Sequence, residues 1–273
     1  MLLNTNNIKY NILLDESNLS STRTPFVFIH GFTGRSDDWS FIFDRLPKEI
    51  YPIALDLIGH GKSDSPVDGN FYSTESIINQ LDSIFNQLTN KKIILAGYSM
   101  GGRISLSYSI KHPDKIKALI LESTTPGIEE FYEKKERVEF DFLLAEKIKR
   151  EGVESFIDFW LNTPLFASLK HLKNYSEIIE KRLQNNVVGL SNTLEGFSTG
   201  LMPSYWNRLN LLSFPVMLIS GELDSKYTGQ NSKMVNLFPN AIHEIVNEAG
   251  HNVHLEKPNH FSNLVCKFLE KLL

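Results

Sequence analysis

Short apolar, β-branched runs alternate with longer amphipathic stretches along most of this chain. The apolar runs lie at 25–29, 51–56, 92–96, 117–121, 215–219 and 242–246. Apolar residues recur at helical spacing at 74–90, 101–111 and 258–272. Strands that alternate with helices form βαβ units, and their parallel sheet is covered by helices on both faces. Such strands are continuously apolar, as these runs are, so the pattern predicts an α/β fold with a mainly parallel sheet.

The alternation stops between Gly127 and Asn207. This stretch is rich in charged and aromatic residues, has helix-like spacing, and contains no run typical of a parallel strand. We expect residues 127–207 to form a helical lid, inserted into a core made of residues 1–126 and 208–273. Such a lid would lie over the carboxyl ends of the strands, where active sites of open α/β sheets form.

Composition excludes several classes of function. The formal net charge is −4, whereas proteins that bind nucleic acid normally carry a strong basic excess. No run of about 18 apolar residues could span a membrane, and the first residues lack the pattern of a secretory signal. We therefore expect a cytoplasmic protein that binds neither nucleic acid nor membranes. Nothing in the pattern indicates an oligomeric state.

The residue types that usually bind metals form no recognisable metal site in the sequence. Cys266 is the only cysteine, which excludes an internal disulfide and a cysteine metal cluster. The eight histidines show no convincing metal-ligand spacing. We therefore expect neither a metal nor another cofactor.

Residues 97–101, Gly-Tyr-Ser-Met-Gly, match the G-x-S-x-G pattern of a nucleophile elbow. An apolar strand precedes the pattern and a helix follows it, which is the context that it requires. The glycines permit a sharp turn in which a Cβ would clash, and the N-terminus of the following helix favours developing negative charge. We therefore predict that Ser99 is a catalytic serine.

A serine needs a base, and the base needs an acid that orients it. In folds with this elbow, the acid and then the histidine follow the serine along the chain. Asp224 lies just past an apolar run, and His251 lies in the loop before the last helix. The predicted triad is therefore Ser99, Asp224 and His251.

Both partners of Ser99 have an alternative. Glu122 also follows an apolar run and could replace Asp224, while His254 lies three residues past His251. We prefer His251 because Gly250 before it suits a tight loop.

The loop after the first central strand, His30-Gly31-Phe32, predicts an oxyanion hole. In this architecture that loop supplies one backbone N–H, and the residue after the nucleophile supplies another. Here those residues are Phe32 and Met100.

Together these features resemble the α/β-hydrolase family across the whole chain. That fold serves esterases, C–C hydrolases, peroxidases and lyases, so it does not by itself define a reaction.

Arg103 lies one turn into the helix that follows Ser99, and its side chain leans back toward the site. A cation at this end of a helix opposes the dipole, at a cost of some tenths of a kcal/mol. The unfavourable placement indicates a ligand carboxylate or phosphate, although a nearby Asp or Glu could equally be the partner.

Several segments resemble one branch of this family, the 2-succinyl-6-hydroxy-2,4-cyclohexadiene-1-carboxylate synthases of menaquinone and phylloquinone biosynthesis. They are GYSMGGR, LESTTPGIEE, the lid, GELDSKY and AGHNVHLEKP. The resemblance implies a lyase that eliminates pyruvate from 2-succinyl-5-enolpyruvyl-6-hydroxy-3-cyclohexene-1-carboxylate. In this 2,5-elimination Ser99, made basic by His251, would abstract a ring proton, and Asp224 would hold the imidazole.

The implied substrate carries three carboxylates. By the same resemblance, Arg103, Arg137 and Arg182 match the arginines that bind it, and Trp160 matches an aromatic of its pocket. Tyr98, beside the nucleophile, either lines the pocket or packs. Without the resemblance, Arg137 reads as an exposed helix charge, and Trp160 fits the lid core at least as well as a ligand contact. Residues 127–207 hold ten Lys+Arg and thirteen Asp+Glu, so a positive field must come from a few inward-facing side chains.

Two other functions stay open on sequence alone. The generic triad fits a small-molecule serine hydrolase, either a carboxylesterase or a C–C bond hydrolase. A non-catalytic binding protein on a hydrolase scaffold is the third possibility, which the intact order of Ser, Asp and His disfavours.

Overall fold

The computed structural model describes residues 1–18 and 22–273. Within these residues, an eight-stranded sheet has the order β1-β2-β4-β3-β5-β6-β7-β8. The strands are β1 (Leu2–Thr5), β2 (Ile8–Leu13), β3 (Thr24–Ile29), β4 (Ile50–Leu55), β5 (Ile93–Tyr98), β6 (Ile116–Glu122), β7 (Val216–Gly221) and β8 (Ala241–Val246). All neighbours from β4 to β8 in this order pair in parallel. The predicted α/β fold with a mainly parallel sheet is confirmed.

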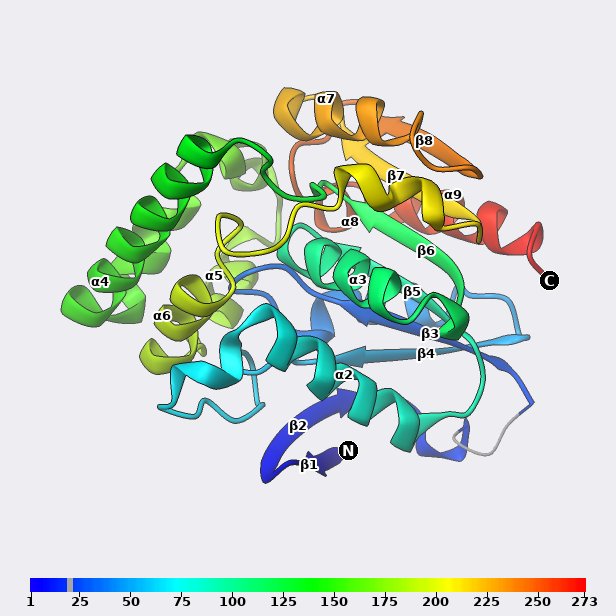
Figure 1. Cartoon of the computed structure of the whole chain (residues 1–273), viewed down its shortest axis with the longest axis horizontal. Helices are drawn as coiled ribbons and strands as arrows, with labels where there is room; N and C mark the ends of the chain where they lie inside the picture. The colour runs from blue at the N-terminus through cyan, green and yellow to red at the C-terminus, as the bar shows by residue number, and fades with distance from the viewer. Residues whose placement is uncertain (19–21) are drawn as a thin grey trace.

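Helices cover both faces of the sheet (Figure 1). Those outside the lid are α1 (Ser40–Phe43), α2 (Thr74–Leu88), α3 (Met100–Lys111), α7 (Ser225–Met234), α8 (Val253–Glu256) and α9 (Pro258–Glu270). Side chains of a strand point alternately to its two faces. In β3, Val27 and Ile29 join the apolar cluster under α2 and α3, whereas Phe26 and Phe28 join the cluster under α1 and α9. This two-sided burial explains why the strands are apolar throughout.

The first two strands are not among the predicted elements. β1 and β2 form an antiparallel hairpin, and β2 then pairs with β4 in the antiparallel direction. Asn6 and Asn7 form its turn with φ angles of 52° and 62°, a left-handed conformation that Asn tolerates well. The signal was present, because buried Ile8, Tyr10 and Ile12 alternate with polar residues at the period of a half-buried strand.

The segment 127–207 is mainly helical and contains no strand in the described structure. It holds α4 (Phe131–Leu161), the 3₁₀ segment η5 (Pro164–His171), α5 (Tyr175–Leu183) and α6 (Val187–Gly196). Figure 1 shows α4, α5 and α6 grouped beyond the carboxyl ends of the parallel strands. These helices enclose an apolar cluster of their own. Throughout the described ranges, no helix is both long and apolar enough to cross a membrane.

The two ends of this segment meet. The Tyr205 N–H donates to the Pro126 carbonyl at 2.8 Å, and the Trp206 indole N–H donates to the Gly127 carbonyl at 3.0 Å. The segment therefore leaves and rejoins the sheet at one place, which is typical of an insertion.

Two buried histidines support the loop that carries Phe32. The His30 and His60 rings lie 5.1 Å apart, and the Phe32 ring contacts His60 edge-on. His30 Nε2 accepts the Leu57 N–H, while His60 Nδ1 lies 3.1 Å from the Ile58 carbonyl oxygen. Burial, with a smaller contribution from His30, lowers the pKa of His60 to about 3. His60 is therefore neutral in the folded protein at neutral pH.

The burial of neutral His60 predicts that acid lowers the stability of the folded protein. In the unfolded chain His60 has a pKa of about 6.5, so between pH 6.5 and 3 the unfolded state binds more protons than the folded state. The free energy of unfolding therefore decreases as the pH falls through that range, by roughly 2–3 kcal/mol at pH 4.5 from His60 alone. Urea unfolding of His60→Asn between pH 7 and 4.5 should show a shallower pH dependence, by about one proton. The exposed-site variant His260→Asn is the control, and equal slopes in wild type and His60→Asn would contradict the assignment.

Candidate active site

Ser99 lies at the turn between β5 and α3 with φ 51° and ψ −108°, a conformation that non-glycine residues rarely adopt. The turn is held by close backbone packing. A Cβ on Gly97 would overlap the Gly101 carbonyl, and a Cβ on Gly101 would overlap the carbonyls of Ile29 and His30 in β3 and the loop after it. Both glycines are therefore required by the approach of α3 to the sheet.

In the predicted triad, His251 lies within hydrogen-bond reach of both Ser99 and Asp224. His251 Nε2 lies 3.0 Å from Ser99 Oγ, and His251 Nδ1 lies 2.7 Å from an Asp224 carboxylate oxygen. When Nδ1 carries the proton, this N–H donates a hydrogen bond to Asp224, and Nε2 is free to accept one from the Ser99 hydroxyl. Asp224 and His251 are both buried. This arrangement can activate the serine oxygen as a base or as a nucleophile.

The alternative acid and base pair with each other instead. Both carboxylate oxygens of Glu122 lie 2.9 Å from His254 Nδ1, and one of them also accepts the His254 backbone N–H. The His254 ring stacks on Trp39 with the ring centres 4.3 Å apart. This buried pair is separate from Ser99 in the hydrogen-bond pattern, so geometry favours Asp224 and His251 as the partners of Ser99.

The predicted oxyanion hole consists of two backbone N–H groups. Met100 is the first residue of α3, so its N–H has no partner within the helix. Neither that N–H nor the Phe32 N–H donates a hydrogen bond to another group in the described part of the chain. Both residues line the same cavity as Ser99. Free donors beside a nucleophile are suited to stabilise a developing oxyanion.

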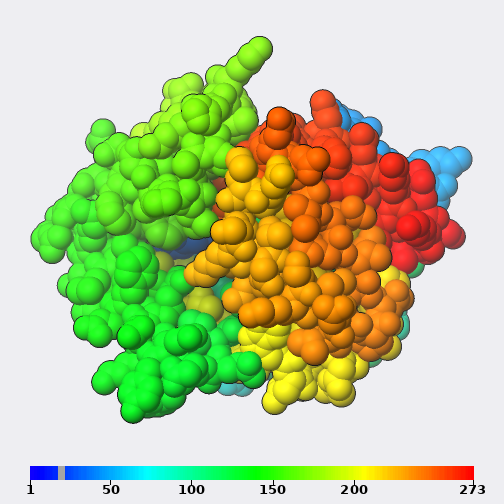
Figure 2. Space-filling model, turned by 90° about the horizontal axis from the view of Figure 1, so that it is seen from above, coloured from blue at the N-terminus to red at the C-terminus, as the bar shows by residue number. Residues whose placement is uncertain are grey.

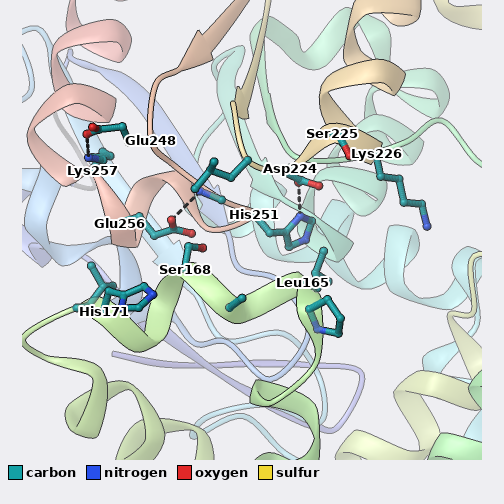
Figure 3. A pocket seen from close by; sticks show the side chains of 15 residues that line it. Leu165, Ser168, His171, Asp224, Ser225, Lys226, Glu248, His251, Glu256 and Lys257 are labelled. Atoms are coloured by element: carbon teal, nitrogen blue, oxygen red, sulfur yellow. Dashed lines mark hydrogen bonds and ion pairs between the residues drawn. The ribbon is translucent and has the colours of Figure 1, made fainter.

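The cavity that contains Ser99 has a volume of about 290 Å³ and lies between the lid and α7. Figure 2 shows a hollow between the lid (green) and the segment around α7 (orange). A larger hollow of about 660 Å³ is lined by His251 and Asp224 (Figure 3), but neither Ser99 nor Met100 lines it. The smaller cavity is therefore the candidate active site, because it contains the reactive oxygen.

Arg103 lines this cavity and has no carboxylate partner among the described residues. Its guanidinium donates to the Phe197 carbonyl at 3.1 Å, contacts the Met202 sulfur and lies 4.8 Å from the centre of the Phe197 ring. Only 9% of Arg103 is exposed. Burial, and to a lesser degree Arg137, lowers the pKa of Arg103 to about 10. A buried cation without an ion-pair partner is unfavourable unless an anion joins it, so the cavity is suited to a ligand carboxylate.

Two of the residues predicted in the lid also line the cavity. Arg137 binds Asp141 through Nε at 2.8 Å, and its side chain faces the cavity beside Arg103. The Trp160 ring stacks on Phe156, and its buried indole N–H has no partner in the described structure. An unpartnered donor at a cavity wall is suited to bind a ligand oxygen.

Arg182 and Tyr98 lie elsewhere. Arg182 is buried and forms an ion pair with Asp38 at 2.8 Å, which joins α5 to the core. Burial alone would raise the pKa of Asp38, but Arg182 and His254 hold it below its ordinary value. Tyr98 packs between the rings of His251 and His254. Neither Arg182 nor Tyr98 lines the cavity that contains Ser99.

Lys226 is a cavity residue that sequence reasoning missed. It is exposed at the start of α7 and lines the Ser99 cavity, the larger hollow behind the triad and a third hollow beside Arg137. The signal was available, because Lys226 is a cation in the first turn of a helix, as Arg103 is. Its place beside three hollows puts a positive charge at the mouth of the cavity, with the ammonium 5.5 Å from the centre of the Tyr227 ring.

The fold and the site define a class, namely enzymes with a Ser–His–Asp triad on an α/β-hydrolase scaffold. Residues 24–258 match the family model described as alpha/beta hydrolase fold.

Similarity to individual proteins narrows this class. A Bacillus subtilis (strain 168) protein, provisionally named 2-succinyl-6-hydroxy-2,4-cyclohexadiene-1-carboxylate synthase, is 42% identical over 90% of both chains. The synthase of that name from Enterobacter sp. (strain 638) is 32% identical over 85% of this chain and 86% of its own. The structure of MenH from S. aureus superposes with a TM-score of 0.90 at 32% identity, covering 96% of this chain and 98% of that chain. The chain therefore belongs to the α/β-hydrolase fold family and, within it, to the 2-succinyl-6-hydroxy-2,4-cyclohexadiene-1-carboxylate synthases, which are lyases.

The elbow geometry predicts a strong effect of Gly101→Ala. The added Cβ would meet backbone carbonyls that cannot move aside, so the free energy of unfolding should decrease by about 1–3 kcal/mol, as measured in urea. Gly229→Ala in α7 is the control, because no atom lies within 4 Å of its Cβ position. There alanine should be neutral or stabilise by up to about 1 kcal/mol. Equal stability of the two variants would contradict the packing argument.

Proposed function

We propose that this protein eliminates pyruvate from 2-succinyl-5-enolpyruvyl-6-hydroxy-3-cyclohexene-1-carboxylate, with Ser99, Asp224 and His251 as its catalytic triad. The observation that carries the proposal is Arg103, a buried cation without a carboxylate partner in the cavity that contains Ser99. An ester hydrolase needs no such group, whereas a substrate with three carboxylates does. The relatives named as this synthase support the same reaction.

The chemistry begins with a proton transfer. His251 accepts the Ser99 hydroxyl proton while the Ser99 oxygen removes the ring proton next to the succinyl ketone. Electrons flow into the ketone, and the N–H groups of Phe32 and Met100 stabilise the resulting oxyanion. When the oxyanion collapses, the double bond shifts around the ring and the ring carbon–oxygen bond to the enolpyruvyl group breaks. The released enolate takes up a proton and becomes pyruvate, and no bond to Ser99 forms.

Substrate carboxylates bind to the cations of the cavity. Arg103 binds a carboxylate from the inner wall and Arg137 binds one from the lid, since the planar guanidinium matches a carboxylate with two parallel hydrogen bonds. Trp160 donates its free indole N–H, and Lys226 binds at the mouth. Arg182 acts indirectly in this arrangement, because its ion pair with Asp38 holds α5 of the lid against the core.

The remaining assignments follow from this reaction. Residues 127–207 are the lid that closes the cavity, and residues 1–126 and 208–273 are the core. The reaction needs no cofactor, and it belongs to menaquinone or phylloquinone biosynthesis in the cytoplasm.

The direct test supplies the enolpyruvyl substrate and measures pyruvate release. Wild-type protein should release pyruvate, and Ser99→Ala should lose most of the turnover, by about 10²–10⁴-fold, because the base is gone. Intact-protein mass spectrometry during turnover should show no acyl group on Ser99. Folded wild-type protein that releases no pyruvate, but acquires an acyl group from p-nitrophenyl esters, would instead indicate a serine hydrolase.

Arg103→Met should separate binding from stability. Methionine keeps the length of the side chain but removes the charge, so kcat/KM for the enolpyruvyl substrate should fall by about 30-fold or more. Because Arg103 has no carboxylate partner, the free energy of unfolding should stay unchanged or increase. The exposed-site variant Arg208→Met serves as control and should retain wild-type kcat/KM. A large loss of stability without a loss of kcat/KM would contradict the role of Arg103 in binding.

A further inference from the structure

Glu256 holds the loop that carries His251. One oxygen of its carboxylate accepts the Gly250 N–H at 2.6 Å, and the other accepts the Asn252 N–H at 3.1 Å. These are the backbone groups immediately before and after His251. Figure 3 shows Glu256 reaching back to this loop from the larger hollow. Hydrogen bonds from N–H groups to a carboxylate are roughly twice as strong as those between neutral groups, so this contact restrains the loop on both sides of the imidazole.

The rest of α8 fixes Glu256 in place. Each side chain of this four-residue helix packs against a different part of the molecule. Val253 is buried in the apolar cluster under α9, His254 pairs with Glu122, and Leu255 packs against the apolar cluster of the lid. The α8 backbone therefore has little freedom to shift, and the Glu256 carboxylate stays beside His251.

The lid touches the same loop. A Cβ on Gly250 would overlap the hydroxyl of Ser168 in η5, so Gly250 allows the lid to pack directly on the residue before His251. Without a second restraint, movement of η5 could displace the imidazole. Glu256 supplies that restraint from beside Ser168, since one of its carboxylate oxygens lies 3.1 Å from the same Cβ position, and it does not line the cavity that contains Ser99.

We propose that Glu256 is a positioning residue, which keeps His251 within reach of Ser99 by binding the two amides that flank the imidazole. The proposal rests on the role of His251 as base in the proposed function, but not on the identity of the substrate. A mispositioned imidazole slows every reaction of Ser99, since a misplacement of about 1 Å can cost on the order of 10²-fold in rate.

The test compares Glu256→Gln with Glu248→Gln. Both variants remove one negative charge from the same hollow, but Glu248 pairs with Lys257 and its side chain accepts neither amide. The first readout is the rate at which a fluorophosphonate labels Ser99, which requires His251 but no lyase substrate. The second readout is kcat and KM for pyruvate release, and thermal unfolding of each variant reports the fold.

The expected result is a loss of on the order of tenfold or more in labelling rate and kcat for Glu256→Gln. KM should stay unchanged, and Glu248→Gln should behave as wild type. Wild-type rates in Glu256→Gln, or equal losses in both variants, would overturn the proposal. If Glu256→Gln does not fold, the same rates are measured for Glu256→Asp. Its shorter carboxylate should reach only one amide, so labelling rate and kcat should lie between those of wild type and of a complete loss. Failure of pyruvate release in wild type with intact labelling would instead count against the proposed function alone.

Discussion

The active site depends on the close approach of α3 to the strands β3 and β5. At Gly97 and Gly101 the backbones lie so near one another that neither position can hold a Cβ. This contact forces the chain through a left-handed conformation at Ser99 and directs the serine oxygen out of the sheet. It also leaves the Met100 N–H unpaired at the start of α3, in a cavity that Phe32 lines as well. One steric constraint therefore places the Ser99 oxygen and leaves a backbone N–H free beside it, and the strain at Ser99 is compensated by packing around it.

Charge pairing explains how an acidic protein can hold a cavity whose one unpaired buried charge, among the described residues, is positive. The buried carboxylates near the site are each bound by a partner: Asp38 by Arg182, Glu122 by His254, and Asp141 by Arg137. Arg103 is the buried cation that stays without a carboxylate in the described part of the chain. The net charge of −4 therefore says little about the cavity, because in a poorly solvated site the nearest unpaired charge dominates.

Much of the fold and the centre of the site could be predicted from local patterns. The strand–turn–helix context of Ser99 and the chain order of Asp224 and His251 are local features, and the structure brings these three residues together. The hairpin β1–β2 was missed because its alternation is short and interrupted by four asparagines. Lys226 was missed because an exposed lysine carries no sign of its neighbours in space, although it lies in the first turn of a helix as Arg103 does. Arg182 carries the same side chain as Arg103, but its place beside Asp38 has no local sequence signal.

The amino-acid order determined the class of fold, the serine of the elbow and the chain order of its hydrogen-bond partners, because periodicity and turn chemistry act over a few neighbouring residues. The tertiary structure decided which charged side chains pair, because the partners are far apart in the chain. Glu122 and His254, 132 residues apart, bind each other and leave Asp224 to His251. Arg182 and Asp38 are 144 residues apart, and their ion pair directs one lid arginine to the core while Arg137 faces the cavity. Such pairings are set by the folded geometry, since the energy of a buried charge depends on the groups around it in space.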